Sequence, residues 1–200
     1  MCTTLWRKNG WGRTVSSTVI DTIQQTINGQ CRLRRQDRNW IIPAQPPIAI
    51  RAPHRHSIAF SLDDPQNKYL AFFDSKPPRH LAKMCDALAA VWHADQLYLF
   101  AIEVKTGNKD DANKQIANGQ HFWAWLEALL KEHGYLHAEI RHIDLLIWKP
   151  RIDDSQQLMK REEALKRAPD KRPLGNGAFS VRFEAQNISH IQLLDLIKQW

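Results

Sequence analysis

Three charged residues in the middle of the chain have the types and the spacing of a hydrolytic centre. Glu103 and Lys105 stand two positions apart at the end of the apolar run LYLFAIEVK, which predicts a buried strand. Because side chains alternate along a strand, both leave the same face of the sheet. Asp86 opens another apolar run, DALAAVW, and residues 93–96 between the two runs predict a turn. A hairpin would therefore bring Asp86 beside Glu103.

Two carboxylates and an ammonium group suit the hydrolysis of a phosphodiester. Mg²⁺ takes oxygen ligands, usually one or two carboxylates together with waters. Such a metal lowers the pKa of its water and offsets the charge of the phosphate, while a nearby ammonium orients that water or stabilises developing charge. Lys105 is positioned for the second role. We therefore expect Mg²⁺ as the cofactor, with Mn²⁺ as a substitute.

Asp86 is followed by sixteen intervening residues, then by Glu103-Val104-Lys105 and a predicted helix. This order of charged residues resembles that of the PD-(D/E)XK nucleases, the restriction-endonuclease-like family. The resemblance implies an α/β fold with a mixed central β-sheet flanked by helices. It also implies that Asp86 and Glu103 bind the metal, that the main-chain carbonyl of Val104 adds a ligand, and that Lys105 assists the nucleophile. Gln115 matches a glutamine that faces the site in many members, so it is a fourth candidate catalytic residue.

The resemblance covers roughly residues 83–130 and departs from the family pattern at two positions. Cys85 replaces the proline of the motif, which the family tolerates. Gly119 stands where exonucleases of the RecB type carry a tyrosine, which argues against that subclass. The alternative reading of Gln115 is an ordinary solvated helix residue.

The segments around this motif indicate one domain over residues 1–200, with the catalytic core at 81–150. Residues 1–80 are expected to hold a helix at 17–28, ended by Gly29, and then a segment rich in proline and arginine. Four prolines between residues 43 and 53 make a central strand improbable, so we predict irregular or edge structure over 31–57.

Further elements follow from periodicity. A helix that ends at Gly134 comes after Gly107, and a strand is expected at 140–148. The charged stretch 160–172 predicts a short helix or a loop, and AFSVRFEA alternates as a half-exposed strand does. The last thirteen residues have helical spacing at Ile191, Leu194 and Ile197.

Positive charge is spread along the chain, which has a formal net charge of +7 and a pI near 9.5. Such a surface favours a polyanion, and double-stranded DNA is the expected partner. We assign contacts with the phosphate backbone to five basic residues, with plain solvated surface as the alternative. These residues are Arg32, Arg34, Arg35, Lys109 and Lys114.

Three cysteines without a C-x-x-C pair argue against a disulfide framework, and no apolar stretch is long enough for a transmembrane span. We therefore expect a cytoplasmic protein that does not contact a membrane. The predicted function is a metal-dependent DNA endonuclease of restriction, defence or recombination. A homodimer would supply the two centres needed to cut both strands. The alternatives are a non-catalytic nucleic-acid-binding module of the same fold and an enzyme that cleaves RNA or nucleotides.

Overall fold

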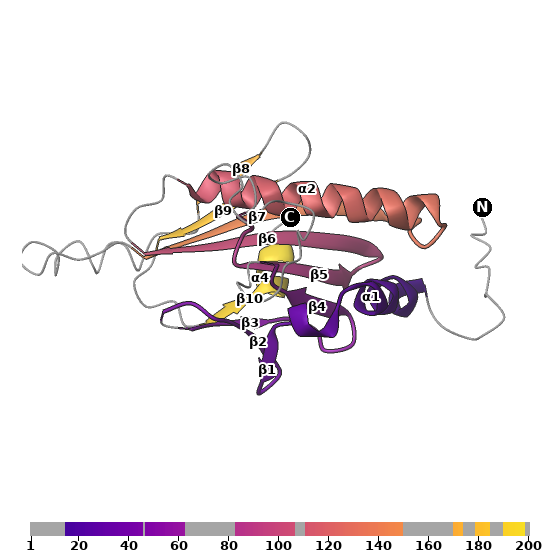
Figure 1. Ribbon diagram of the computed structural model, residues 1–200, viewed down its shortest axis with the longest axis horizontal. Helices are drawn as coiled ribbons and strands as arrows, with labels where there is room; N and C mark the ends of the chain where they lie inside the picture. The colour runs from indigo at the N-terminus through magenta and orange to yellow at the C-terminus, as the bar shows by residue number, and fades with distance from the viewer. Residues whose placement is uncertain are drawn as a thin grey trace, which may run out of the picture.

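Two β-sheets lie face to face, and two helices cover the outer face of the larger sheet (Figure 1). This computed structural model describes residues 15–45, 47–62, 83–106, 111–149, 170–173, 179–184 and 190–198. The expected α/β class with a mixed sheet and flanking helices is confirmed at this level. None of the helices in the described ranges is long and apolar enough to span a bilayer.

The larger sheet has six strands in the order β4-β5-β6-β7-β9-β8. The neighbours β4, β5 and β6 are antiparallel, β6, β7 and β9 run parallel, and β8 pairs antiparallel with β9. The strands are β4 (Ser57–Phe60), β5 (Ala87–His93), β6 (Gln96–Thr106), β7 (Glu139–Lys149), β8 (Asp170–Pro173) and β9 (Phe179–Glu184).

The predicted hairpin is present as β5 and β6. His93 pairs with Gln96, so the loop has only two residues, Ala94 and Asp95. Both have positive φ, 48° and 61°, as a type I′ turn requires. This turn fixes the register that runs back along both strands to Ala87 opposite Ile102. Asp86 and Glu103 are consequently the next residues beyond the last pair.

The helices α1 (Val15–Thr26) and α2 (Ala112–Glu132) pack on one face of the larger sheet. The apolar side of α2 buries Ile116, Phe122, Trp123, Leu126 and Leu130. Gly134 follows with a φ of +70°, so the predicted end of this helix is confirmed. The first helix ends earlier than predicted, and a short 3-10 turn, η1 (Gly29–Cys31), follows it.

The smaller sheet overturns the prediction for residues 31–57. Its strands are β1 (Arg34–Gln36), β2 (Asn39–Ile42), β3 (Ile48–Arg51) and β10 (His190–Gln192), in the order β1-β2-β3-β10. Irregular or edge structure is therefore wrong for β2 and β3, which are both interior strands. The reason is the position of the prolines. Pro43 and Pro47 lie in the connection between β2 and β3, where neither has to donate to the ladder.

Two expectations near the C-terminus also change. The predicted helix or loop at 160–172 is a strand from Asp170 onward, and residues 150–169 lie outside the described part of the chain. The terminal segment is helical only over α4 (Leu193–Ile197), because Ile191 belongs to β10, which pairs parallel with β3. The strands expected at 140–148 and in AFSVRFEA are confirmed as β7 and β9.

The larger sheet separates two hydrophobic cores. Alternate residues of β5, β6 and β7 pack under α1 and α2 on one face and against the smaller sheet and α4 on the other. On β6, for example, Leu99 and Ala101 belong to the helix side, whereas Phe100 and Ile102 belong to the side of the smaller sheet. Glu103 and Lys105 continue the helix side of this alternation.

Candidate active site

The carboxylates of Asp86 and Glu103 meet where the hairpin opens. The backbone N–H of Asp86 donates to Oε2 of Glu103 at 3.2 Å, and the backbone N–H of Val104 donates to Oδ2 of Asp86 at 2.6 Å. The main chain at Asp86 thus binds the carboxylate of Glu103, and the main chain of β6 binds the carboxylate of Asp86. This reciprocal pairing follows from the register of β5 and β6, which places Asp86 opposite Glu103.

Lys105 and Gln115 complete a contiguous polar cluster. The ammonium of Lys105 lies 2.5 Å from Oε1 of Glu103 and also donates to Oε1 of Gln115. Gln115 belongs to the first turns of α2, so this helix begins beside the end of β6. The four predicted catalytic residues therefore form one series of direct contacts, from Asp86 through Glu103 and Lys105 to Gln115. Val104, between Glu103 and Lys105, packs its side chain on the opposite face, against the smaller sheet.

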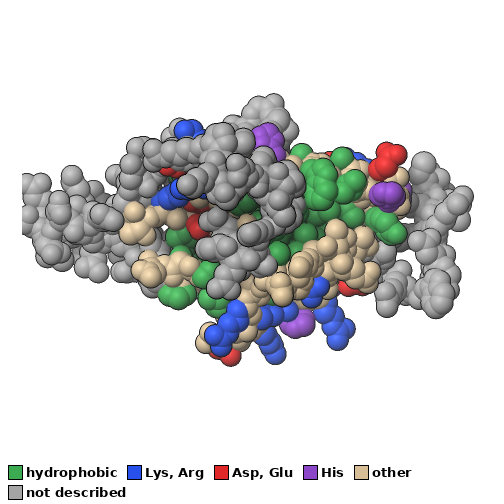
Figure 2. Space-filling view, in the orientation of Figure 1, with side chains coloured by type: hydrophobic (Ala, Val, Ile, Leu, Met, Phe, Trp, Pro, Cys, Tyr) green, Lys and Arg blue, Asp and Glu red, His purple; other side chains and the backbone are tan. Residues whose placement is uncertain are grey.

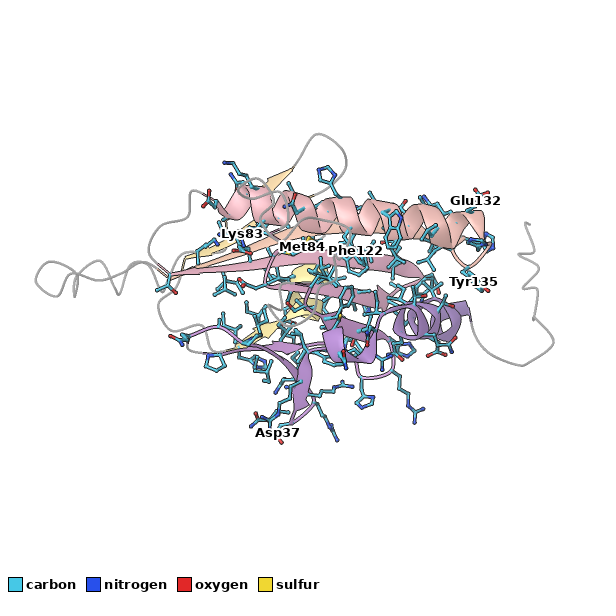
Figure 3. The ribbon with its side chains drawn as sticks, viewed as in Figure 1. Asp37, Lys83, Met84, Phe122, Glu132 and Tyr135 are labelled. Carbon is cyan, nitrogen blue, oxygen red and sulfur yellow. The ribbon has the colours of Figure 1, made fainter. Side chains whose placement is uncertain are left out.

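Helix α2 also holds the segment that carries Asp86. The side-chain amide of Gln115 donates to the carbonyl of Met84 at 3.1 Å, and that of Asn118 donates to the carbonyl of Lys83 at 2.7 Å. Figure 3 shows Lys83 and Met84 beneath the first half of α2. Gln115 and Asn118 are three positions apart, so they project from one side of the helix. Sequence reasoning missed Asn118, although its spacing from Gln115 was a usable signal.

Burial perturbs the protonation of Glu103. This residue is completely buried, whereas Lys105 retains about a fifth of its side-chain exposure, 21%. Burial, followed by the nearby carboxylate of Asp86, raises the pKa of Glu103 to about 7, against the opposing effect of Lys105. The carboxyl group of Glu103 therefore changes charge near neutral pH, which is common in reactive centres.

The residue that replaces the proline of the motif has a packing role. Cys85 is buried, and burial raises the pKa of its thiol, so it is not a reactive nucleophile. It faces α2 at Gly119, where an added Cβ would come within 2.6 Å of the sulfur. Gly119 is thus needed for the close approach of α2 to the sheet.

The donor atoms of this cluster fit a hard divalent cation. Two carboxylates are what Mg²⁺ ordinarily takes from a protein, with waters filling its remaining positions. Oε1 of Glu103 is buried, has Lys105 as its charge partner, and makes no hydrogen bond within the described ranges. Among the described residues no group of three or more His, Cys, Asp and Glu side chains lies together, so a purely protein-built cage is not found there.

A second polar chain ties α2 to β7 further along the same face. The side-chain amide N–H of Gln120 donates to the carboxylate of Asp144, and Oε1 of Gln120 accepts from Nδ1 of His142 at 2.8 Å. Nε2 of His142 lies 3.1 Å from Glu127. Burial raises the pKa of Asp144 above its usual range. These hydrogen bonds fix the direction of α2 across the sheet. Nothing in the sequence indicated them.

The predicted nucleic-acid contacts do not gather around this cluster. Arg34 and Arg35 lie in β1 of the smaller sheet, on the other side of the larger one, whereas Arg32 precedes β1 and forms a bridge with Phe60 of β4 (Figure 1). Figure 3 shows the neighbouring Asp37 at the opposite extreme of the molecule from α2. Arg32 donates to the carbonyl of Gln24 at 2.6 Å, and Arg35 stacks on Trp40 at 4.6 Å.

Of the two predicted lysines, only Lys114 can be placed. It is exposed in the first turn of α2, one residue before Gln115, so it borders the cluster. Lys109 lies outside the described residues. The arginines and the lysines thus belong to two separate surfaces.

Comparison with known protein families, with curated proteins and with solved structures found no match. The likeness to PD-(D/E)XK nucleases therefore stands on the motif and on the contacts described above.

Proposed function

We propose that this protein is a metal-dependent nuclease that hydrolyses nucleic-acid phosphodiester bonds, with DNA as the substrate. The observation that carries the proposal is the contact set of Asp86, Glu103 and Lys105. A buried carboxylate lies 2.5 Å from an ammonium and accepts from the main chain beside a second carboxylate. Burying such a pair costs more solvation than a surface pair, and two apolar residues of similar volume would serve stability equally well. A chemical role would explain why the protein buries this ion pair despite the loss of solvation free energy.

The charged groups divide the expected roles. Asp86 and Glu103, with the carbonyl of Val104, would hold Mg²⁺ or Mn²⁺, which when bound supplies an activated water and offsets phosphate charge. Lys105 is the one cation in contact with the cluster among the described residues, so it would orient the nucleophile or stabilise the negative charge that develops on the phosphate oxygens. Gln115 accepts a hydrogen bond from the ammonium of Lys105 and donates one to the carbonyl of Met84, so it positions both Lys105 and the backbone that leads to Asp86.

The start of α2 supports the same assignment. A helix N-terminus carries unpaired N–H groups and a partial positive charge that favour an anion such as phosphate. Here Gln115, the fourth residue of α2, contacts Lys105, which in turn contacts Glu103.

The decisive experiment compares Lys105→Met with Lys131→Met. Lys131 makes the same kind of contact, 2.5 Å from Glu127, but at the far end of α2, so it is a matched control. Plasmid, linear single-stranded DNA and RNA are each incubated with Mg²⁺, Mn²⁺ or EDTA. We expect cleavage with either metal, none with EDTA, at least about a hundredfold lower kcat for Lys105→Met, and near wild-type rates for Lys131→Met.

Two results would contradict the nuclease assignment. Cleavage that persists in EDTA would show that the reaction does not need a metal. Wild-type rates for both Lys105→Met and Asp86→Asn would show that the Asp86 cluster is not the catalytic site. Binding of DNA without cleavage of any substrate would instead favour the non-catalytic module. Cleavage of RNA alone would support the metal-dependent mechanism but show that RNA, and not DNA, is the substrate. Thermal unfolding of each variant checks that the fold is retained.

A homodimer, a cytoplasmic location and a role in restriction, defence or recombination belong to the same proposal. The dimer follows from the need to cut two strands, the location from the lack of a cysteine framework in the sequence, and the biological role from analogy with the family. Size-exclusion chromatography of the protein with and without a DNA duplex tests the dimer directly.

A further inference from the structure

A groove of about 530 Å³ lies on the smaller sheet, away from the Asp86 cluster. Three arginines, Arg38, Arg51 and Arg55, line it together with His54 and Gln192. Its centre is Arg51 at the end of β3, which pairs with Asn39 of β2 on one side and with Gln192 of β10 on the other. The groove therefore forms only when segments from both ends of the chain pair in one sheet.

The arginines of this groove form no ion pair within the described ranges. All three arginines are exposed, and none of them forms an ion pair with a described Asp or Glu. The one described carboxylate bonded to a groove residue is Asp195, which accepts from Gln192 at 3.2 Å. Arg32 donates to the carbonyl of Gln24, and Arg35 stacks on Trp40, although its buried Nε and Nη2 have no hydrogen-bond partner within the described ranges. Exposed guanidinium groups that line one groove without an ion pair bind an anion through charge-assisted hydrogen bonds.

One of the arginines is held in a costly backbone conformation. Asp37 and Arg38 form the two-residue turn between β1 and β2 with φ values of 48° and 68°. A residue with a side chain in this left-handed region costs roughly 1 kcal/mol, and glycine or asparagine would be cheaper there. The tight turn fixes where Arg38 leaves the sheet, next to Arg51.

We propose that this groove binds the phosphate backbone of a nucleic-acid strand, as an anchoring contact separate from the cleavage centre. Guanidinium groups match phosphate oxygens with two parallel hydrogen bonds, and three of them along an open groove suit successive phosphates. Apolar wall residues such as Leu194 would face sugars. Figure 2 shows Lys and Arg side chains gathered along this side of the molecule. The nature of the polymer rests on the proposed function, whereas binding itself does not require cleavage.

The test measures binding of a labelled 30-base-pair DNA duplex by fluorescence anisotropy in EDTA, at several salt concentrations. The groove variant is the double substitution Arg51→Gln and Arg55→Gln in the full chain. The control, Lys131→Gln with Arg141→Gln, removes the same charge from α2 and β7, where each cation has only a surface ion pair. Both variants must unfold at wild-type temperatures.

We expect the groove variant to bind about tenfold more weakly near 0.1 M salt, with a salt dependence reduced by about two ion equivalents. The control should change affinity less than threefold. Arg51→Lys with Arg55→Lys should recover much of the affinity, because the charges return. Equal binding by the groove variant and the wild type would overturn the proposal, as would equal losses in the groove variant and the control.

Two further measurements separate the possible outcomes. Titration with ATP or pyrophosphate identifies a small-ligand pocket: saturable binding that depends on Arg51 and Arg55, with unchanged duplex binding, would overturn the strand proposal. Cleavage by the wild type with Mg²⁺ is scored independently. If the groove variant loses duplex binding and the wild type cleaves no substrate, the groove proposal stands and the nuclease proposal is refuted. If the wild type cleaves and the groove variant binds the duplex as the wild type does, the nuclease proposal stands and the groove proposal is refuted.

Discussion

Glu103 is the most deeply buried of the four residues in the Asp86 cluster. It has no exposed surface, and it touches both the main chain at Asp86 and the ammonium of Lys105. A charge in such a place is costly unless a cation compensates for it. Lys105 compensates in part, and a divalent cation would complete the compensation. Metal binding and the charge of Glu103 are therefore expected to be linked.

This linkage predicts how stability depends on pH without metal. The pKa of Glu103 is about 7 in the folded protein against an ordinary value of 4.5, so the folded state binds more protons between these values. Stability contributed by protonated Glu103 is complete below pH 4.5 and is lost as the pH rises through 7. We expect Glu103 to lower the free energy of unfolding by on the order of 2 kcal/mol between pH 5 and pH 8.

Urea unfolding of Glu103→Gln in EDTA checks this expectation. The variant should lose that part of the pH dependence, because glutamine does not titrate. Glu139→Gln is the matched control, since Glu139 has a 60% exposed side chain and should leave the dependence unchanged. Identical pH profiles for wild type and Glu103→Gln would show that Glu103 titrates normally.

At the scale of elements, the contact between α2 and the larger sheet brings Gln115 to Lys105. Gly119 sets the distance of this contact. An added Cβ would lie 2.6 Å from Sγ of Cys85 and 3.2 Å from both Ala101 and Leu88. On an exposed helix, replacing glycine with alanine stabilises by about 1 kcal/mol. Here the clash with fixed strand residues is the larger effect.

We therefore predict that Gly119→Ala destabilises the protein by about 2 kcal/mol, because α2 must move away from β5 and β6. Chemical denaturation measures the loss, and nuclease activity should fall with it as Gln115 separates from Lys105. The double variant with Cys85→Ala should recover part of the stability, since the sulfur is the nearest obstacle. A more stable Gly119→Ala variant would contradict this view of the packing.

At the scale of the whole molecule, the larger sheet is buried on both faces. The smaller sheet contributes Ile42, Ile48 and Ile50 to the core that it shares with β5, β6 and β7. Folding of the two sheets should therefore be cooperative, as in one domain. The Asp86 cluster and the basic groove lie on opposite sides of this arrangement, so a nucleic acid that bound at both would have to reach around an edge or contact the two faces with separate segments.

Ile50→Ala tests the shared core, because Ile50 is fully buried between the sheets. We expect a loss of about 3 kcal/mol in a single unfolding transition, followed equally by circular dichroism and tryptophan fluorescence. Ile41→Ala is the control, since Ile41 is only half-buried and alternates to the outer face of β2. Two separate transitions would mean that the smaller sheet folds independently.

The sequence by itself determined the central part of this protein. The hairpin of β5 and β6, the long helix ended at Gly134 and the strand β7 follow from local periodicity and turn chemistry. The contacts among Asp86, Glu103 and Lys105 also follow, because a two-residue turn fixes the register and side chains alternate along each strand. Gln115 was expected from the family resemblance, and its contact with Lys105 depends on the packing of α2 on the sheet. Local rules suffice where all partners lie within about thirty residues.

Only the tertiary structure decided the rest. The smaller sheet requires β3 to pair with β10, about 140 residues away, and no local pattern at 31–57 reveals that partner. The same pairing brings Gln192 beside Arg51 and creates the basic groove. Packing of the smaller sheet against the larger one places Arg34 and Arg35 of β1 on the side away from the cluster. Charge along a sequence shows how much positive surface exists, whereas long-range strand pairing decides which face carries it.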